Sequence, residues 1–581
     1  SYLHCRPGQN DCPLPDADYV WVGFDGSKIM GHRTLDWYGS PQFGKARQKV
    51  EEYLQKNASR QFGLILWGVG NHGGGPSRKD LDDLKNLIAE RNDLTIRHSV
   101  PEEYFADVCC NGTNPPYHER DLNPWGVGCY TSQIRVKQRH RQLENELFVT
   151  EKMAASAAIQ GVMNYPKNEL NDALLDLLMA EFHDILPGSS IQPVEESALR
   201  LMDHGLEIVS RVKARAFFAL SQGQPKARNG EIPILAYNPH PFSVKGVFEC
   251  EFNLPDAVWD KQFSTPIVTL QNVPVPCQTE QELSNVNLDW RKRCVFFAEL
   301  KPMQITRFDC ALKVLPERPA PALKSEGGAI SIKTEFLEVS INCNTGFLDR
   351  YVVNGVDFVK KNSFQAVVMK DNEDPWGMLQ NKFHDVAGKF RIASPKLAAW
   401  VAGLDGKELD PVRVIEDGDV RSVVEAIFSF NRSFMIIRYC IPKNSGEIEV
   451  QVRVHWNEKD RMLKLCVPVA FRKPKFMGQV AFGRDELPGQ DREVVAQKWV
   501  AAISDKSALT CINDGVYGSD FWNHTIRFSL LRSPAYAGHP IDGRPIVPQD
   551  RYTPRHDQGE RFYRFWLQGG QTEERMAHVE R

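Results

Sequence analysis

The sequence predicts a multidomain protein with an α/β part, an all-α part and an all-β part, in that order. Three observations predict this class. Strand and helix signals alternate up to about residue 125, apolar residues then recur at helical spacing from about 132 to 222, and helical periodicity is lost beyond about 230. We therefore expect domains at 1–125, 126–228 and 229–581.

The first segment predicts a parallel sheet accompanied by helices. Tyr19–Phe24 and Leu94–Arg97 are short runs rich in aromatic or β-branched residues, and Phe62–Val69 is continuously apolar, as in a strand buried on both faces. Ser-x-x-acid sequences at Ser77 and Ser99 are typical of helix starts. Strands alternating with helices indicate an α/β layer, and the segment is too short to close a barrel by itself.

The middle segment predicts a three-helix bundle. Its helices are expected at about 132–160, 167–187 and 192–222, separated by Pro166 and by Pro187-Gly188. Beyond about 230, strand-like runs alternate with Pro, Gly and Asn turns over some 350 residues. That length and pattern predict two or more β-sandwich units.

Composition excludes several classes of function. The 581 residues are 42% hydrophobic and 25% charged with a formal net charge of -3, so neither a nucleic-acid nor a membrane-surface partner is indicated. Thirteen cysteines, an odd number at irregular spacing, favour reduced thiols and a cytoplasmic location. The chain opens at Ser1 without Met in a polar, proline-containing run, from which we expect a fragment.

The glycine-rich loop Gly70–Pro76 is the first site candidate. Consecutive glycines allow a ligand to approach the backbone closely, and the loop follows the predicted buried strand, where α/β folds place their sites. The alternative is a flexible turn. Two look-alike motifs nearby are set aside: Gly39–Ala46 lacks the final Ser/Thr of a phosphate-binding loop, and His72–Gly75 resembles an esterase oxyanion loop without any GxSxG elbow in the chain.

The second site candidate is the His183-Asp184 pair at the end of a strongly apolar helix. Burying these groups is costly unless they are paired, and imidazole and carboxylate suit zinc or sugar hydroxyls. The alternative is that His183 caps the helix and Asp184 is solvated. Further polar and aromatic residues, interpreted as loop or junction residues, are Asp374, Trp376, His384, Asp385, Trp125 and Tyr130.

Five segments carry a family resemblance, in matching order: Tyr19–Arg33, Leu66–Arg78, Gly128–Glu144, Glu181–Ile191 and Val495–Asp505. They resemble the glycoside hydrolase family 38 α-mannosidases in a form typical of bacterial members. The pieces FHDILPGSS and GNHGGGP are the specific ones. The resemblance implies that 1–125 is the C-terminal part of a catalytic β/α barrel, followed by the helix bundle and β-sandwich domains.

The resemblance implies a zinc-dependent hydrolase that releases terminal α-mannosyl residues with retention. By that match His183 would be a zinc ligand, Asp184 and Asn71 would bind substrate, and His72 is a candidate acid/base. Family members also use an HxD pair and a nucleophilic Asp. Neither motif is found in this sequence, so we expect the nucleophile and the remaining zinc ligands upstream of Ser1.

The implied partner is an α-mannoside oligosaccharide, with no nucleic acid and no membrane, and homo-oligomerisation is left open. The main alternative is a non-catalytic carbohydrate-binding protein derived from the same fold. A weaker alternative is a structural β-sandwich scaffold without a ligand, against which the glycine-rich loop argues.

Overall fold

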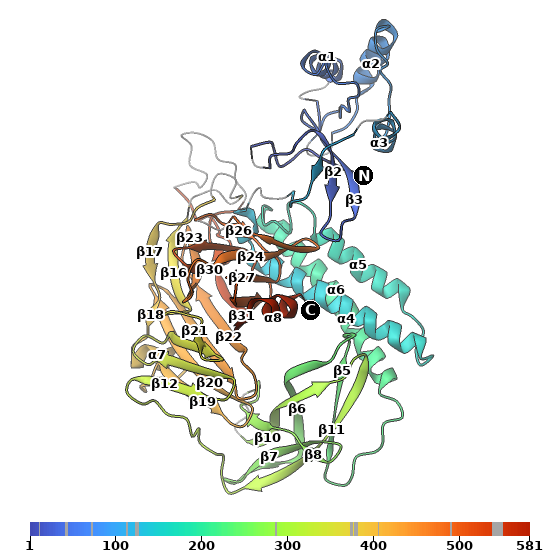
Figure 1. Ribbon diagram of the computed structural model, residues 1–581. Coiled ribbons are helices and arrows are strands. Elements are labelled where there is room, and N and C mark those ends of the chain that lie inside the picture. The colour runs from blue at the N-terminus through green and yellow to red at the C-terminus, as the bar shows by residue number, and fades with distance from the viewer. Residues whose placement is uncertain are drawn as a thin grey trace. The chain divides into compact units, whose positions relative to one another are not determined.

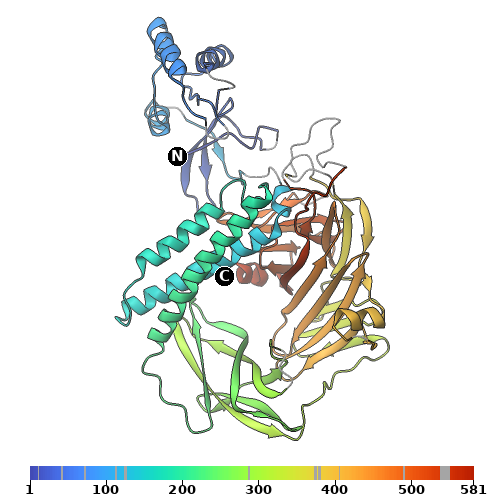
Figure 2. The same ribbon diagram turned by 180° about the vertical axis from the view of Figure 1, so that it is seen from behind.

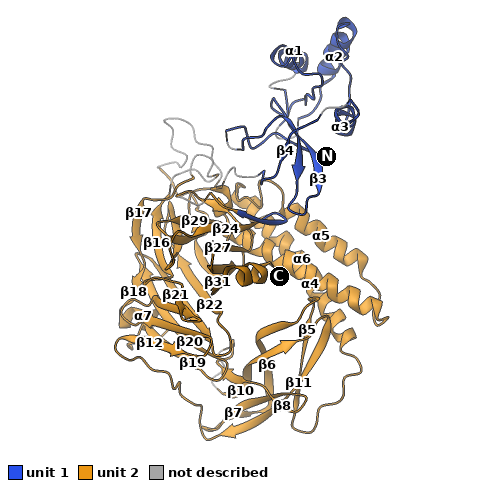
Figure 3. Ribbon diagram, in the orientation of Figure 1, with its two compact units in different colours: residues 1–125, 480–485 blue, residues 126–479, 486–581 orange. Residues whose placement is uncertain are grey.

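The computed structural model is a mixed α/β protein with many sheets, which confirms the predicted class at that level (Figures 1 and 2). It describes residues 1–10, 12–40, 44–70, 74–111, 114–122, 127–284, 288–371, 376, 381–404, 406–488, 491–536 and 550–580. Two compact units are formed, one by Ser1–Trp125 with Val480–Asp485 and one by Gly126–Gln479 with Glu486–Arg581 (Figure 3). No helix among the described residues is long and apolar enough to cross a membrane.

The first unit contains a small mixed sheet rather than the predicted parallel one. Its strand order is β1 (Tyr2–His4), β3 (Lys28–Arg33), β2 (Asp18–Val22) and β4 (Tyr117–His118). The β1–β3 and β2–β4 pairs are parallel, whereas β2 and β3 are antiparallel because the turn after Val22 reverses the chain directly. Its helices are α1 (Ala46–Lys56), α2 (Arg78–Glu90) and α3 (Pro101–Cys110). The unit also includes Val480–Asp485, which contains most of the strand β25 (Gly483–Glu486).

The predicted strand Phe62–Val69 is wrong in its hydrogen bonding but not in its apolar pattern. Residues 62–67 form no strand, and within the described chain the run pairs only at Val69, through bridges to Ser40 and Gly75. Its side chains still separate two apolar clusters, with Phe62 and Leu64 on α3 and Ile65 and Trp67 on α1 and α2. A strand needs neighbouring strands to satisfy its N–H and C=O groups. Among the described residues, 62–67 are paired with no other strand. Leu94–Arg97 likewise forms no strand.

The helix starts in this unit follow their capping residues. Ser77 is the N-cap of α2, and its hydroxyl accepts a hydrogen bond from the Asp80 N–H at 3.1 Å. The second start differs slightly from prediction. Val100 is the N-cap of α3 and Pro101 its first residue, while Ser99 donates to the Glu103 carboxylate at 2.8 Å.

Three long helices begin the second unit after a single turn, η1 (Cys129–Thr131). They are α4 (Ile134–Ile159), α5 (Lys167–Ala180) and α6 (Gln192–Leu220), and they lie side by side in both views. The close approach of α4 and α6 has a local cause: a Cβ on Gly205 would lie 3.0 Å from a Leu143 methyl. The second helix ends at Ala180 rather than at 187 as predicted, because the chain tightens into i→i+3 hydrogen bonds at Glu181 and Phe182.

A two-sheet β-structure follows the helices. One sheet has the order β6-β10-β9 and the other β5-β11-β7-β8, and the apolar side chains of both meet in one cluster that contains Phe296 and Phe308. The strands are β5 (Ile232–Asn238), β6 (Val244–Val258), β7 (Phe263–Leu270), β8 (Val273–Pro274), β9 (Cys277–Glu280), β10 (Asp289–Leu300) and β11 (Gln304–Leu315).

Three further sheets form the rest of the second unit. The small one comprises β12 (Ala329–Lys333), β13 (Leu337–Asn342), β14 (Leu348–Val353) and β15 (Val356–Asp357). The next has the order β17 (Val386–Lys389), β16 (Gln365–Lys370), β23 (Arg461–Pro468), β30 (Thr525–Arg532), β29 (Gly518–Trp522), β26 (Val494–Val495). The largest runs β18 (Arg391–Ile392), β20 (Arg421–Phe430), β21 (Ser433–Pro442), β22 (Ile448–Trp456), β31 (Gly559–Gln571), β28 (Ser507–Asn513), β27 (Trp499–Ile503), β24 (Lys475–Val480), with β19 (Val412–Asp417) beside β20.

These sheets pack face to face around aromatic side chains. Phe528 on β30 and Phe565 on β31 lie with ring centroids 5.0 Å apart, and the buried Tyr563 hydroxyl donates to the Leu530 carbonyl at 3.0 Å. The small sheet is tied on by Tyr351, whose hydroxyl accepts from the Gly569 N–H at 3.1 Å. Two short helices, α7 (Pro395–Val401) and α8 (Thr572–Val579), accompany the largest sheet.

Packing of α4 against α6 predicts a specific stability loss. Changing the fully buried Leu143 to Ala should lower the free energy of unfolding by about 2–5 kcal/mol, because a cavity remains where α4 meets α6. Guanidinium denaturation followed by the helical circular dichroism signal measures it. Leu175→Ala on α5 is the control: its side chain is 56% exposed, so a change below about 0.5 kcal/mol is expected. Equal effects would contradict the packing.

Candidate functional site

The candidate site is the turn at 181–190, which joins α5 to α6. Glycine is required in it at position 188, where φ is +86° and a Cβ would lie 2.5 Å from the Ser132 carbonyl oxygen. Ile185 points the other way, into the apolar core of the three helices. The turn is therefore fixed on its inner side, against the residues that precede α4.

A buried ammonium group holds the backbone of this turn. Lys137 on α4 donates to the carbonyls of Leu186 at 3.0 Å and Pro187 at 3.3 Å, and also to Ser132. Its side chain is fully buried, and burial lowers the pKa of Lys137 to about 8. These carbonyls belong to no helix or strand, so the lysine satisfies acceptors that would otherwise be buried without partners.

A second anchor ties the end of the turn to the residue that precedes α4 through a side-chain amide. The Gln133 side chain donates to the Ser190 carbonyl at 2.7 Å and accepts from the Ser190 hydroxyl at 2.9 Å. Gln133 has a left-handed backbone, with φ of 50°, and the next amide, that of Ile134, donates to Asp557 at 2.9 Å. The start of α4, the turn and β31's preceding segment are thus joined in one buried layer.

His183 and Asp184 project from this anchored turn into solvent. The His183 side chain is 78% exposed, and its Nε2 lies 3.4 Å from the Asp184 carboxylate, which is beyond a good hydrogen bond. Asp184 uses Oδ1 to accept from the Ser189 hydroxyl at 3.0 Å, so Oδ2 faces the imidazole. The structure therefore brings together the two residues that the sequence singled out, with nitrogen and oxygen lone pairs accessible to a ligand.

The donor set of this pair fits part of a zinc shell. Neutral imidazole nitrogen and carboxylate oxygen are ligands that zinc accepts in proteins. Within the described ranges no group of three or more His, Cys, Asp or Glu side chains could hold a metal, so His183 and Asp184 would have to share the ion with other ligands. Asn71 and His72 lie outside the described residues, so their place relative to this pair stays a prediction.

The remaining sequence candidates lie elsewhere. His384 stacks on Trp522, with centroids 4.4 Å apart and an interplanar angle of 6°, and the Asp385 carbonyl accepts from the Lys370 amide. The Trp376 carbonyl accepts a hydrogen bond from the Cys129 thiol, and Tyr130 lies in the single turn η1. Asp374 and Trp125 fall outside the described residues. None of the placed residues adjoins His183 in these contacts.

Sequence reasoning missed the charged layer beneath the turn. Arg135 pairs with the buried Glu195 at 2.8 Å, and Tyr536 donates to the same carboxylate. His556 is buried beside Tyr536, and burial together with the neighbouring Arg532, Lys137 and Arg135 charges lowers the pKa of His556 to about 3. The partners come from segments hundreds of residues apart, so no local spacing could have revealed them.

Comparison with known proteins assigns the segments that carry this geometry. Residues 127–220 match the domain described as "Alpha mannosidase middle domain", and residues 332–546 match "Glycosyl hydrolases family 38 C-terminal domain". The chain belongs to glycosyl hydrolase family 38. The turn with His183 and Asp184 lies inside the first match, between two of the three helices.

The relatives of this family 38 chain are α-mannosidases. It is 23% identical to Alpha-mannosidase G of Dictyostelium discoideum over 90% of this chain and 49% of that protein. It is 22% identical to human Alpha-mannosidase 2C1 over 90% of this chain and 47% of that protein. The chain thus spans about half the length of the curated relatives it matches. A crystal structure of an alpha-mannosidase from Enterococcus faecalis V583 shares the fold at a TM-score of 0.73 and 15% identity, covering 97% of this chain and 70% of that one.

Removing the Lys137 ammonium from this family 38 chain should loosen the turn. In Lys137→Met the Leu186, Pro187 and Ser132 carbonyls lose their donor, so backbone amides of 181–190 should exchange hydrogen at least about tenfold faster, since one lost buried hydrogen bond costs about 1–3 kcal/mol. Hydrogen exchange with mass spectrometry measures this. Lys152→Met, on the exposed side of the same helix, is the control and should leave the peptide protected. Equal protection in both variants would contradict the anchor.

His556 should make stability depend on pH in a defined direction. The pKa of His556 in the folded chain is about 3, below its ordinary value of 6.5. Between pH 3 and pH 6.5 this imidazole is therefore protonated in the unfolded chain and neutral in the folded chain. The free energy of unfolding should therefore fall as pH drops from 6.5 towards 3.

The variant His556→Phe should flatten that fall, and His578→Phe, with an exposed imidazole, should retain it. Denaturant titrations at a series of pH values compare the three proteins. Parallel pH profiles for the original chain and His556→Phe would show that burial of this imidazole costs nothing.

Proposed function

We propose that this chain is the part of a zinc-dependent α-mannosidase that supplies one zinc ligand and part of the sugar pocket, within an enzyme that hydrolyses terminal α-mannosides with retention. The observation that carries the proposal is the exposed His183-Asp184 pair on a turn whose backbone is anchored by Lys137 and Gln133. Membership of family 38 and α-mannosidase relatives support it.

The roles of the residues follow from their chemistry. His183 would hold zinc through a ring nitrogen, and Asp184 would accept hydrogen bonds from sugar hydroxyls through its half-exposed carboxylate. When bound, zinc would orient and polarise sugar hydroxyls and favour ring distortion. We assign Asn71 to substrate binding and His72 to acid/base work as proposals. The nucleophilic carboxylate that retention requires is assigned to residues outside this chain, which spans about half of its relatives.

Anchoring explains why such a turn suits catalysis. Metal ligands and substrate-binding groups act best when their geometry is set before the ligand arrives, because ordering them on binding costs free energy. Here the backbone is fixed by buried hydrogen bonds while both side chains remain accessible. We further propose a β/α-barrel origin for residues 1–125, and a cytoplasmic location on the strength of the 13 irregularly spaced cysteines.

Replacing His183 tests the proposal. In the protein that contains this chain, His183→Ala should lower zinc content and reduce hydrolysis of an aryl α-mannoside at least about 100-fold, since loss of even an outer-shell partner of a metal ligand costs 10–100-fold. Metal analysis and a colorimetric assay measure both. His204→Ala is the matched control, because His204 is also an exposed histidine of the same helical segment. Unchanged zinc and activity in His183→Ala would overturn the assignment, and sugar binding without zinc or turnover would favour a carbohydrate-binding protein.

A further inference from the structure

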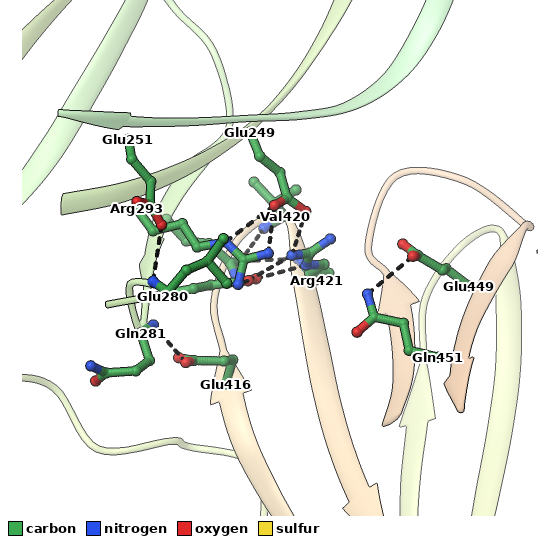
Figure 4. A network of polar contacts seen from close by, with 12 residues as sticks. Glu249, Glu251, Glu280, Gln281, Arg293, Glu416, Val420, Arg421, Glu449 and Gln451 are labelled. Atoms are coloured by element: carbon green, nitrogen blue, oxygen red, sulfur yellow. Dashed lines mark hydrogen bonds and ion pairs between the residues drawn. The ribbon is translucent and has the colours of Figure 1, made fainter. Parts of the chain in front are cut away.

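A polar cavity of about 340 Å³ lies far along the chain from the His183-Asp184 turn, between the first β-structure and the largest sheet. One wall comes from β9 and β10, through Glu280 and Arg293. The other comes from β19 to β22, through Glu416, Arg421 and Gln451 (Figure 4). No residue of α4, α5 or α6 lines it, so the cavity and the turn share no side chain.

A buried ion-pair network fixes the shape of this cavity. Arg421 pairs with both oxygens of Glu280, at 2.7 and 2.6 Å, and with Glu249 at 2.8 Å. Arg293 donates to Glu249 at 3.1 Å from the neighbouring strand. Figure 4 shows Arg421 and Glu249 reaching towards each other, Glu249 from β6, the strand that pairs with β10. Such buried charges are tolerated because each is paired, and the pairing holds the walls at a set separation before any ligand arrives.

The sheet places further polar groups on the same face of the cavity. Arg438 and Gln451 are directly opposite in the β21–β22 register, and Arg453 follows Gln451 by two residues, which puts all three on one face. The Gln451 amide donates to Glu449 at 3.0 Å, and its carbonyl oxygen remains as an acceptor. Arg438 and Arg453 use one nitrogen each on Glu425 and Glu560, so each guanidinium keeps further N–H donors.

The charge balance selects the class of ligand. The arginines that line the cavity are already paired with carboxylates, so an anion would find no uncompensated cation there. Two of the lining carboxylates, Glu280 and Glu416, are likewise paired with arginines. Burial raises the pKa of Glu416, whose carboxylate accepts a hydrogen bond from the Gln281 backbone N–H at 2.7 Å. What remains is a set of alternating donors and acceptors. Hydroxyl groups both donate and accept, so a neutral polyhydroxylated molecule matches such a surface.

Two neighbouring cavities extend the surface beyond one sugar unit. One, of about 320 Å³, shares Arg438, Gln451 and Arg453 with the first and is lined also by Phe562, an aromatic ring that is 39% exposed. The other, of about 770 Å³, shares Gln281, Glu416 and Arg438. Each volume lies within the range of about 300–1,000 Å³ that is typical of small-molecule sites. An aromatic ring beside polar groups suits the apolar C–H face of a sugar.

We propose that these three connected cavities form a carbohydrate-binding site for a neutral oligosaccharide, separate from the His183-Asp184 turn. The site needs neither zinc nor hydrolysis, so it stands or falls independently of the proposed catalytic role. Its position on the β-structures would let the protein hold one part of a branched glycan while another part is engaged elsewhere.

Calorimetric titration of the chain in a chelator, with α-linked mannotriose and cellotriose as probes, tests the proposal. We expect one binding event with at least one of them, and at least a tenfold rise of Kd in both Gln451→Leu and Arg453→Gln. Gln451 and Arg453 carry no buried ion pair, since Arg453 bonds a carboxylate that is 58% exposed, so both variants should fold. Gln192→Leu, at a half-buried glutamine on α6 that lines none of the three cavities, is the control and should bind as the original chain does.

The outcomes separate the two sites. Binding that survives His183→Ala and is lost in Gln451→Leu supports the proposal. Binding that is lost in His183→Ala but kept in Gln451→Leu and Arg453→Gln overturns it, as does the absence of binding by either trisaccharide at millimolar concentration. Mannose 6-phosphate serves as the anionic comparison, and a preference for it over both neutral probes would contradict the inferred charge balance.

Discussion

A fully buried guanidinium joins the helical segment to the β-sheets, and the geometry of the candidate site depends on it. Arg532, on β30, pairs with both oxygens of Asp371 at 2.8 Å and donates to the Gly128 carbonyl at 2.9 Å and the Ser132 hydroxyl at 3.3 Å. Gly128 and Ser132 flank the single turn that precedes α4. An arginine without these partners could not be buried there, because an unpaired charge in the interior costs several kcal/mol. The same interaction therefore fixes both a sheet and the start of a helix.

From that point the restraint passes to the turn through neighbouring polar groups. Ser132 also accepts from Lys137, which donates in addition to Leu186 and Pro187, while Gln133 bonds Ser190. Each step satisfies a backbone group that lies outside helices and strands. The consequence is a turn whose backbone is held on its buried side and whose His183 and Asp184 side chains are presented on its exposed side. Rigidity of the main chain and accessibility of the functional groups thus have a single cause.

The two polar regions of the second unit use charge in opposite ways. At the turn, the charged residues lie beneath the surface and position a pair that stays accessible to a ligand. In the cavity between the β-structures, the charged residues form the surface itself and neutralise one another, as Arg421 and Glu280 do. The first arrangement suits a metal and a reacting sugar, whereas the second suits hydrogen bonding to neutral hydroxyls. The turn and the cavity share no residues, so a substitution can alter one of them without altering the other.

The sequence by itself determined the mixed α/β class, the helices of the middle segment and the position of the candidate pair along the chain. Helical periodicity placed α4, α5 and α6, and the Ser77 capping sequence placed the start of α2, because these signals depend on residues within one or two turns of each other. His183 and Asp184 stood out because two polar groups end an apolar helix.

Tertiary structure decided the rest. The apolar run at 62–69 has the composition of a buried strand, yet whether it becomes one depends on neighbours that its own residues cannot specify. No local pattern marks Lys137, Arg532 or His556 as buried, and each is buried by contacts that form only in the folded chain. The cavity arises in the same way, from strands of two separate β-structures. Local patterns encode helices and turns because their interactions are local, whereas buried charge and cavity shape are set by contacts that form only when the whole chain has folded.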